Sequence, residues 1–383
     1  MPAPAYYEFF AGGGMARAGL GESWTCLFAN DFDPRKAASY RRNWGAAHFR
    51  EGDIHALTAA DLPGRADLAW ASFPCQDLSL AGVGAGLNGA RSGAFFGFAR
   101  LMAALAREGR APKALALENV AGLLSARGGA DFSALCRTLR ELGYKFGALT
   151  IDAAHFLPQS RPRLFVVALR RDLNAPQGLV ADAPCGDWST SALVRAKDAL
   201  PKALARDWIW WRLPPPPARN QNFADLLEPA PRDVAWLSGE DTKRLLALMA
   251  PIHRARLDAA KAAHGRVVGT LYRRTRRDET GARVQRAEAR FDGLAGCLRT
   301  PAGGSSRQSV VVVENGRVRA RLLSGREAAR LMGLPEDYRL PARYNEAYHL
   351  IGDGVAVPVV RFLSEFLLTP LANCEPSAAV AAE

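Results

Sequence analysis

Short apolar runs alternate with helical patterns between residues 5 and 170 of this 383-residue chain. The apolar runs have the length of buried strands, and amphipathic stretches such as Phe95–Arg107 and Phe132–Leu142 lie between them. This alternation predicts an α/β domain built on one sheet. We expect strands at Ala5–Phe10, Trp24–Asn30, Leu68–Ser72, Ala114–Leu117, Gly147–Ile151 and Leu164–Leu169.

The pattern changes in the second half of the chain. The segment WIWWRLPPPPARNQNF (208–223) predicts a semi-rigid, extended connector. The stretch after it shows little periodicity and is basic, with 12 Lys and Arg against 5 Asp and Glu between Arg254 and Arg299. Helical patterns return at Gly325–Met332 and Val355–Leu368, and the last residues, EPSAAVAAE, predict a disordered tail.

Glycines and polar side chains follow the first predicted strands. Ligands of open α/β sheets bind outside the carboxyl ends of the strands, so these residues mark a candidate site. The first strand leads into a glycine turn, FFAGGGMARAGL, and the second leads to Asp31 and Phe32. Asp31 lies 19 residues after Gly12, near the spacing of a ribose-binding acid, which favours an adenosine-containing cofactor. Taken alone, Asp31 would be an ordinary turn aspartate.

The later strands bring a thiol, a carboxyl group and two guanidinium groups. In ASFPCQDLSLAG (71–82) a proline ends the strand, which holds Cys75 at a strand end. LENV places Glu118 after the next strand. The link between residues 151 and 164 is too short for a parallel crossover, so we expect an antiparallel strand that brings Arg161 and Arg163 to the same rim. Each residue alone has an ordinary structural explanation, since unpaired cysteines are mostly small buried apolar residues.

Charge and cysteine content narrow the class of protein. The formal net charge of +12 and the pI near 9.8 indicate either a nucleic-acid partner or a drift in composition toward Arg and Ala. The six cysteines are scattered without a Cys-x-x-Cys pair, which argues against a zinc site and a disulfide framework. No apolar stretch suggests a membrane span or a signal peptide. We therefore expect a cytoplasmic protein with no metal and no membrane partner.

In their order along the chain, these motifs resemble those of the DNA cytosine-5 methyltransferases. EFFAGGG is similar to the first S-adenosylmethionine motif of that family, and NDF and GDI to its adenosine-contacting motifs. PCQ resembles the nucleophile motif, ENV the acid motif and QSRPR the Gln-x-Arg-x-Arg motif. RLLSGREAARLMGLPEDY (321–338) and IGDGVAVPVV (351–360) resemble the two closing motifs. Asp353 stands where the family usually has Asn, and the glycine in GARSGAFF (89–96) comes later than in the family pattern.

The resemblance implies a fold and a division of the chain. It implies a Rossmann-like S-adenosylmethionine-dependent methyltransferase sheet with a smaller, irregular target-recognition domain. The expected domains are a catalytic and cofactor-binding domain (1–174), the target-recognition domain (175–315), a return to the catalytic domain (316–370) and a flexible tail (371–383).

The resemblance also implies a reaction, in which Cys75 adds to C6 of a cytosine flipped out of double-stranded DNA. Glu118 and Arg163, with Arg161 in support, would stabilise the ring. The implied cofactor contacts are Phe10, Ala11, Gly12, Gly13, Gly14, Asp31, Phe32, Asp53, Ile54, Pro74, Asp353, Gly354 and Val355. The implied DNA contacts are Gln76, Ser79, Arg273, Arg274, Arg276 and Arg277.

Three other functions stay open. An RNA cytosine-5 methyltransferase would share these motifs, but the Cys-Phe-Thr motif typical of the tRNA-modifying branch is absent from the chain. A catalytically idle DNA-binding protein would not require Cys75, Glu118 and Arg163 together. A nicotinamide oxidoreductase would leave PCQ and ENV unexplained. The recognition sequence, the oligomeric state and a cognate restriction endonuclease as partner are not given by the sequence.

Overall fold

The computed structural model describes residues 2–74, 93–300 and 306–375. The chain forms two compact units. Unit 1 comprises Met1–Ile151, Pro162–Pro216 and Val359–Glu383, and unit 2 comprises Asp152–Arg161 and Pro217–Pro358. In comparison with the domains expected from sequence, residues 175–216 fall in unit 1 and residues 316–358 in unit 2.

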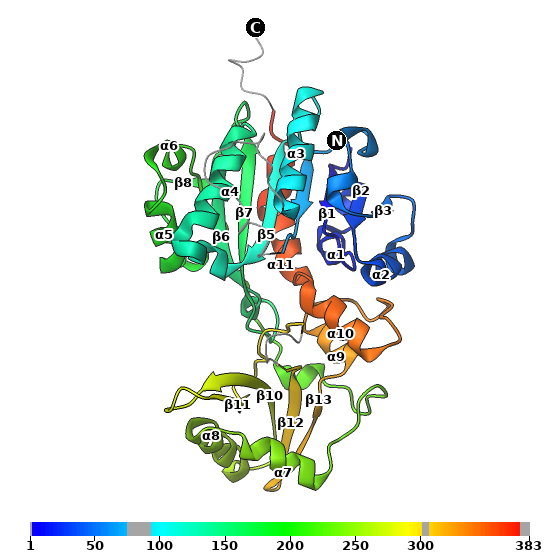
Figure 1. Ribbon diagram of the computed structural model, residues 1–383, viewed down its shortest axis with the longest axis vertical. Helices are drawn as coiled ribbons and strands as arrows, with labels where there is room; N and C mark the ends of the chain where they lie inside the picture. Colours follow the sequence, from blue (N-terminus) through cyan, green and yellow to red (C-terminus); the bar gives the residue numbers. More distant parts are fainter. Residues whose placement is uncertain (1, 75–92, 301–305, 376–383) are drawn as a thin grey trace. The chain divides into compact units, whose positions relative to one another are not determined.

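Unit 1 is an α/β unit with a seven-stranded sheet in the order β3-β2-β1-β4-β5-β7-β6 (Figure 1). The neighbours from β3 to β5 pair in parallel, and β7 runs antiparallel to β5. This sheet confirms the predicted fold class and all six predicted strands, with ends shifted by a few residues. The strands are β1 (Ala5–Phe9), β2 (Thr25–Asp31), β3 (Phe49–Glu51), β4 (Leu68–Ala71), β5 (Ala114–Val120), β6 (Tyr144–Asp152) and β7 (Pro162–Arg170).

The central strands are almost entirely buried because both faces of the sheet are covered. All four residues of β4, LAWA, are buried. On one face the core includes α3 (Ala94–Arg107) and α4 (Ala130–Glu141), as the amphipathic patterns predict; Phe98 of α3 packs against Phe9 with ring centroids 5.3 Å apart. In the C-terminal helical segment, Ser364 accepts a hydrogen bond from Trp24 Nε1 at 2.9 Å.

The remaining α-helices of unit 1 range from 4 to 11 residues. Two of them, α1 (Met15–Leu20) and α2 (Pro34–Trp44), follow β1 and β2.

The predicted connector at 208–223 is wrong for its first residues. Trp210 and Trp211 form a short strand, β9 (Trp210–Trp211), and are buried, and Trp211 Nε1 donates a hydrogen bond to Val167 O at 3.1 Å. The other elements of unit 1 are strand β8 (Val180–Ala181) and helices α5 (Ser191–Asp198), α6 (Lys202–Ala205), α11 (Val357–Leu363) and α12 (Thr369–Ala372). Helix α11 begins in unit 2 and continues into unit 1.

Unit 2 contains a four-stranded antiparallel sheet in the order β11-β10-β12-β13. Leu271, Ala287 and Val311 of this sheet form a core with Met249, which lies between α7 (Gly239–Ala247) and α8 (Pro251–Ala262), and with Leu257 of α8. The sequence predicts an irregular region here, and this prediction missed the sheet because arginines occupy adjacent positions on both faces of β10 and hide the apolar period. The elements are α7 (Gly239–Ala247), α8 (Pro251–Ala262), β10 (Arg266–Arg277), β11 (Arg283–Arg290), β12 (Ser309–Glu314), β13 (Arg317–Leu322), α9 (Gly325–Arg330) and α10 (Tyr344–Asp353).

One helical segment corrects a statement made from sequence. Tyr344–Ala372 is long and apolar enough to cross a membrane by length and composition alone, with a mean hydropathy of 1.6 in its most apolar window. However, 67% of that window is buried inside the protein, which is also true of core helices. The segment is therefore weak evidence for a membrane span.

Candidate active site

The chain turns sharply after β1. Phe10, Gly12 and Gly14 have φ values of +58°, +57° and +77°, in the left-handed region. For a phenylalanine this backbone costs roughly 1–3 kcal/mol, so the surrounding structure must hold it. At position 14 a Cβ atom would lie 2.2 Å from Trp44 Nε1, which requires glycine. Trp44 Nε1 donates to Gly13 O at 2.9 Å, and so α2 fixes the turn.

Asp31 ends β2 beside this turn. Its Oδ2 accepts a hydrogen bond from Gly12 N at 2.8 Å, and its Oδ1 accepts one from Asp33 N at 2.9 Å. Burial raises the pKa of Asp31, although the two N–H donors oppose the shift. Each carboxylate oxygen keeps a second lone pair for a ligand hydroxyl. Phe32 is 68% exposed, so an apolar ring lies open to stacking next to an acid suited to a ribose.

The segment before Asp53 is tied to the same strand end. Asn30 Nδ2 donates to Gly52 O at 2.9 Å, and Gly52 N donates to Asp31 O at 3.0 Å. The Asp53 side chain accepts from His55 N, and Ile54 is buried. The structure thus brings the glycine turn, Asp31 and the Asp53 segment together, as the sequence predicts. Their arrangement fits an adenosine-containing cofactor.

Glu118 and Arg163 form an ion pair at the rim of the sheet. Arg163 Nε lies 3.2 Å from Glu118 Oε1, and the side chains are 14% and 9% exposed. The pair forms because β7 reverses direction: Arg163 lies opposite Val120, and Phe165 opposite Glu118. The predicted antiparallel strand, which brings the start of β7 to the carboxyl end of β5, is therefore confirmed. The result is a nearly buried acid and guanidinium in one place.

A residue that sequence reasoning gave no role, Asn119, links this pair to the strand before the PCQ motif. Asn119 Nδ2 donates to Phe73 O at 2.9 Å, and its Oδ1 accepts from Val120 N. Its signal in the sequence is a polar residue after Glu118 in an otherwise apolar strand. The bond holds the chain just before Pro74 next to Glu118. The predicted nucleophile Cys75, and Gln76 and Ser79, lie outside the described residues.

Arg161 belongs to unit 2, unlike Arg163. It is 2% exposed, and its guanidinium donates to Leu298 O at 2.7 Å, Gly352 O at 2.9 Å and Gly354 O at 2.6 Å. Arg161 therefore joins three segments of unit 2. Asp353 accepts a hydrogen bond from Thr300, and Val355 is buried. The supporting role of Arg161 and the cofactor contacts expected of residues 353–355 stay predictions.

A buried acid lies in the strand that leads to the glycine turn. Glu8 is 1% exposed, and Tyr40 of α2 donates to its Oε2 at 3.5 Å. Arg17 of α1 donates to the same Tyr40 hydroxyl at 3.1 Å. Burial raises the pKa of Glu8 to about 8. Glu8 therefore joins β1, α1 and α2 around the turn and holds its proton near neutral pH.

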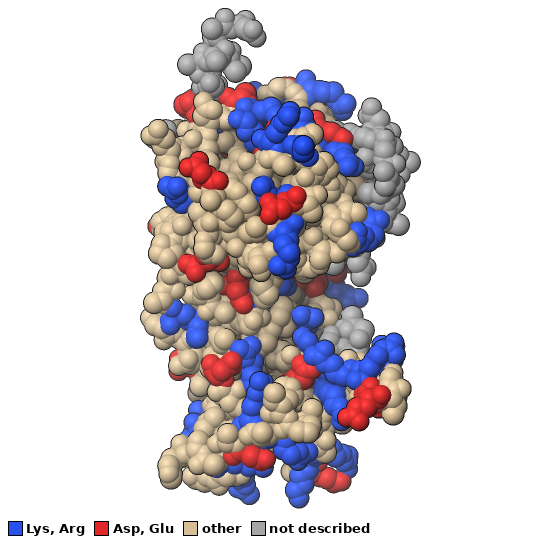
Figure 2. All heavy atoms as spheres, turned by 90° about the vertical axis from the view of Figure 1, so that its left-hand side faces the viewer, with Lys and Arg blue, Asp and Glu red and all other residues tan. Residues whose placement is uncertain are grey.

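The four arginines expected to contact DNA, Arg273, Arg274, Arg276 and Arg277, lie on β10. Figure 2 shows Lys and Arg side chains crowding the part of unit 2 where β10 and β11 lie, with a few acids among them. Among the described residues, no group of three or more His, Cys, Asp or Glu side chains could hold a metal ion.

The sheet, the glycine turn with its ribose-type acid and the acid–arginine pair define a class: an α/β enzyme of the kind that binds an adenosine-containing cofactor. The family follows from comparison with known sequences. The model of the C-5 cytosine-specific DNA methylase family matches residues 5–368. The chain belongs to this family, which confirms the resemblance and the enzyme class expected from the motifs.

Individual relatives agree with the family. The chain is 27% identical to the Type II methyltransferase M.NgoBI of Neisseria gonorrhoeae, over 92% of this chain and 89% of that one. It is 26% identical to the Type II methyltransferase M.HhaI of Haemophilus parahaemolyticus, over 94% and 92% of the two chains. Among solved structures, the Dnmt2 methyltransferase of S. pombe shares the fold, with a TM-score of 0.58, 18% identity, and coverage of 96% of this chain and 99% of that one.

Proposed function

We propose that this protein transfers a methyl group from S-adenosylmethionine to C5 of a cytosine flipped out of double-stranded DNA, within a specific sequence. The observation that carries this proposal is the Glu118–Arg163 pair, 3.2 Å apart at the rim of the sheet that also carries the glycine turn. The description of the family as a C-5 cytosine-specific DNA methylase supports DNA as the substrate, and the names of both sequence relatives, Type II methyltransferases, agree with it. They also favour a cognate restriction endonuclease as partner and a cytoplasmic location at the nucleoid.

The reaction needs a nucleophile because cytosine C5 is too electron-poor to attack a sulfonium methyl group directly. In the proposal the Cys75 thiolate forms a bond to C6, and the electron pair of the C5–C6 double bond becomes available at C5. C5 would then form a bond to the methyl group while the methyl–sulfur bond of the sulfonium breaks, and a neutral thioether would leave. Loss of the C5 proton and breakage of the Cys75–C6 bond then restore the aromatic ring and the thiolate.

Glu118 and Arg163 would stabilise the cytosine ring while the thiolate adds to it. Negative charge develops on the ring when the thiolate adds, and fixed donors stabilise it. Glu118 would hydrogen-bond N3 and the exocyclic amine, while Arg163 would donate to O2. A free thiol has a pKa of about 8.5, and the positive charge of Arg163 would favour the thiolate of Cys75. Strand pairing holds both groups before the substrate arrives, so little reorganisation is required.

The cofactor supplies an electrophilic methyl group on a sulfonium when bound. The turn Phe10–Gly14 would lie along its methionine part, and Asp31 would accept hydrogen bonds from its ribose hydroxyls. Phe32 would stack on the adenine, with Asp53 and Ile54 at the edge of that base. The free lone pairs of Asp31 and the exposed ring of Phe32 support this assignment.

DNA binding would be the task of the basic unit 2. A base inside a duplex is out of reach of Cys75 and must be flipped out. The net charge of +12 favours a polyanionic partner, and arginines of β10 would contact the DNA. Gln76 and Ser79 would line the path of the displaced base.

The experiment is transfer of labelled methyl from S-adenosylmethionine to unmethylated duplex DNA, with Cys75→Ser alongside. Label at cytosine C5 with the wild type alone is expected. If instead RNA and not DNA takes the label, the enzyme is an RNA methyltransferase. Equal label with Cys75→Ser would contradict the mechanism.

A further inference from the structure

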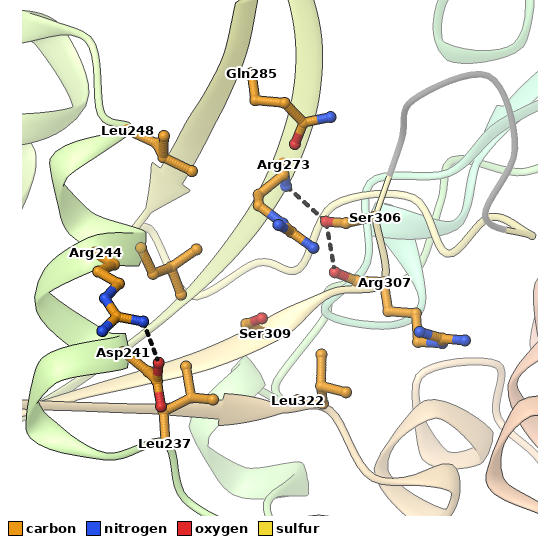
Figure 3. Close-up of a pocket in the computed structure, with 11 residues that line it drawn as sticks. Leu237, Asp241, Arg244, Leu248, Arg273, Gln285, Ser306, Arg307, Ser309 and Leu322 are labelled. Carbon is orange, nitrogen blue, oxygen red and sulfur yellow. Dashed lines mark hydrogen bonds and ion pairs between the residues drawn. The ribbon is translucent and has the colours of Figure 1, made fainter.

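Unit 2 contains a cavity of about 650 Å³ at the side of its sheet, next to α7. Figure 3 shows its lining. The walls are largely apolar, from Leu237, Leu245, Leu248 and Leu322, and polar side chains extend from β10 and β11 over them. The cavity thus has an apolar base with polar side chains at its edge, and hydrogen-bonding side chains of this kind can read base edges.

The pairing of β10 with β11 decides which side chains reach this cavity. Arg273 lies opposite Ala287, and Thr275 opposite Gln285. Paired residues share a face of the sheet, and every second residue lies on that face. Arg273 and Gln285 are therefore diagonal neighbours on one face, and both line the cavity. Arg274 and Arg276 lie on the opposite face.

The arginines of the opposite face are held by an acid. Glu288 Oε1 accepts from Arg276 Nε at 2.6 Å, and Arg274 Nε lies 4.0 Å from Glu288 Oε2. Tyr272 donates to the same carboxylate at 2.8 Å, and its ring packs under Arg274 at 4.7 Å. These partners fix both guanidinium groups and neutralise part of their charge.

The arginine of the cavity face is free by contrast. Within the described part of the chain, the exposed Arg273 guanidinium has no hydrogen bond or ion pair, and neither has the side-chain amide of Gln285. The backbone of Arg273 is fixed nonetheless, because its N–H donates to Ser306 Oγ at 2.7 Å. The other charged groups of the lining are occupied: Asp241 accepts from Ser238 at 2.7 Å and lies 3.5 Å from Arg244, and Arg307 donates to Asn345.

We propose that Arg273 and Gln285 are specificity-determining residues, which contact base edges in the major groove of the recognition site. Arg273 presents a planar fork of donors that matches O6 and N7 of guanine, and Gln285 can bond a neighbouring base. Arg274 and Arg276, held by Glu288, contact phosphates instead. This inference rests on the proposed function, because it assigns residues to the DNA of that same reaction.

The test compares Arg273→Ala and Gln285→Ala with Arg276→Ala, a matched change on the same hairpin but the opposite face. The recognition sequence is first found by sequencing methylated sites in random duplex DNA treated with the wild type. Methylation rates are then measured on that sequence and on each single base-pair change. Arg273→Ala is expected to lower the preference for guanine at one position by about 5- to 150-fold. Arg276→Ala is expected to weaken binding equally for all sequences.

The outcomes separate this inference from the proposed function. If the wild type methylates no cytosine C5 in DNA, the proposed function fails and the inference with it. If the wild type is specific and Arg273→Ala keeps every base preference, the inference alone is overturned. Equal unfolding temperatures of the variants confirm that the comparison is between folded proteins. Loss of the same guanine preference in Arg276→Ala would overturn the division into two faces.

Discussion

The two units of the protein use charged side chains in opposite ways. In unit 1 the acids of the site are buried, lie within or at the ends of strands and have partners, as Glu8, Asp31 and Glu118 show. In unit 2 the arginines expected to contact DNA lie along strand β10, alternate between its faces and are largely exposed. Buried groups with fixed partners suit a reaction that needs charge held in place before the substrate binds. Long, exposed and positively charged side chains suit binding along the surface of a polyanion.

The largest effect is expected from breaking the pair in unit 1. Glu118→Gln keeps the shape but removes the negative charge beside Arg163, and it changes the bonds available to cytosine N3 and its amine. We expect the methylation rate to fall by about 10²–10³-fold, since removal of one fixed stabilising group commonly has that effect. Single-turnover kinetics with saturating DNA measure it. A fall of less than twofold would show that the pair is only structural.

A smaller effect is expected at the cofactor site. Asp31→Asn should weaken S-adenosylmethionine binding by roughly 10- to 100-fold, the range for hydrogen bonds to a charged group. Because burial raises the pKa of Asp31, wild-type affinity should also fall with decreasing pH at a higher pH than for an exposed aspartate. Titration calorimetry across acidic pH checks both. Asp33→Asn, which preserves the cap of α2, is the matched control, and an equal loss there would contradict the role of Asp31.

The buried acid of unit 1 predicts a dependence of stability on pH. The pKa of Glu8 is raised from an ordinary 4.5 to about 8, so the folded protein holds this proton more tightly than the unfolded chain does. The contribution of protonated Glu8 to the free energy of unfolding is therefore complete below pH 4.5, and it is lost as the pH rises through about 8. Glu8→Gln is neutral at all pH. The variant should therefore lack the fall in the free energy of unfolding, on the order of a few kcal/mol, that Glu8 causes in the wild type between these two pKa values.

Thermal unfolding of wild type and Glu8→Gln over this pH range measures the difference. Arg17, Tyr40, Asp31 and Cys26 also influence Glu8, and they remain in the variant. Parallel pH profiles for the two proteins would mean that Glu8 titrates as an ordinary exposed acid.

The smallest effect is expected in unit 2. Glu288→Gln removes the negative charge that pairs with Arg276 and lies near Arg274, so the positive charge of both guanidinium groups acts on the phosphates without partial neutralisation. Binding to nonspecific duplex DNA should tighten a few-fold and depend more steeply on salt, by roughly one more phosphate contact. Fluorescence anisotropy at several salt concentrations tests this. An unchanged salt dependence would mean that these arginines do not contact phosphates.

Sequence patterns were sufficient to predict most strands of unit 1 and the polar residues at their ends. Its strands are continuous apolar runs, and the residues just after each run are the polar groups of the site, because parallel strands deliver their carboxyl ends to one edge. The short link before Leu164 even predicted the reversal that pairs Arg163 with Glu118. What spacing could not give was the supporting contacts, such as Asn119 on Phe73 and Trp44 on the glycine turn, since these depend on packing between distant segments.

Unit 2 was predicted less well for a physical reason. In β10 the sequence RVVGTLYRRTRR places arginines on both faces, so no apolar period marks the strand. The different environments of Arg273 and Arg276 follow from the register with β11, which brings Glu288 to one face only. No local pattern contains that register.

The central claim is that Cys75 forms a bond to the cytosine during transfer. The most direct measurement uses duplex DNA with 5-fluorocytosine at the target position. Fluorine cannot leave C5 as a proton does, so the enzyme should stay bound to the DNA covalently. Mass spectrometry of the digested complex should find the methylated nucleotide on the peptide that contains Cys75. Methylation of ordinary DNA by the same preparation with no adduct on the fluorinated duplex, or an adduct at another residue, would contradict the account.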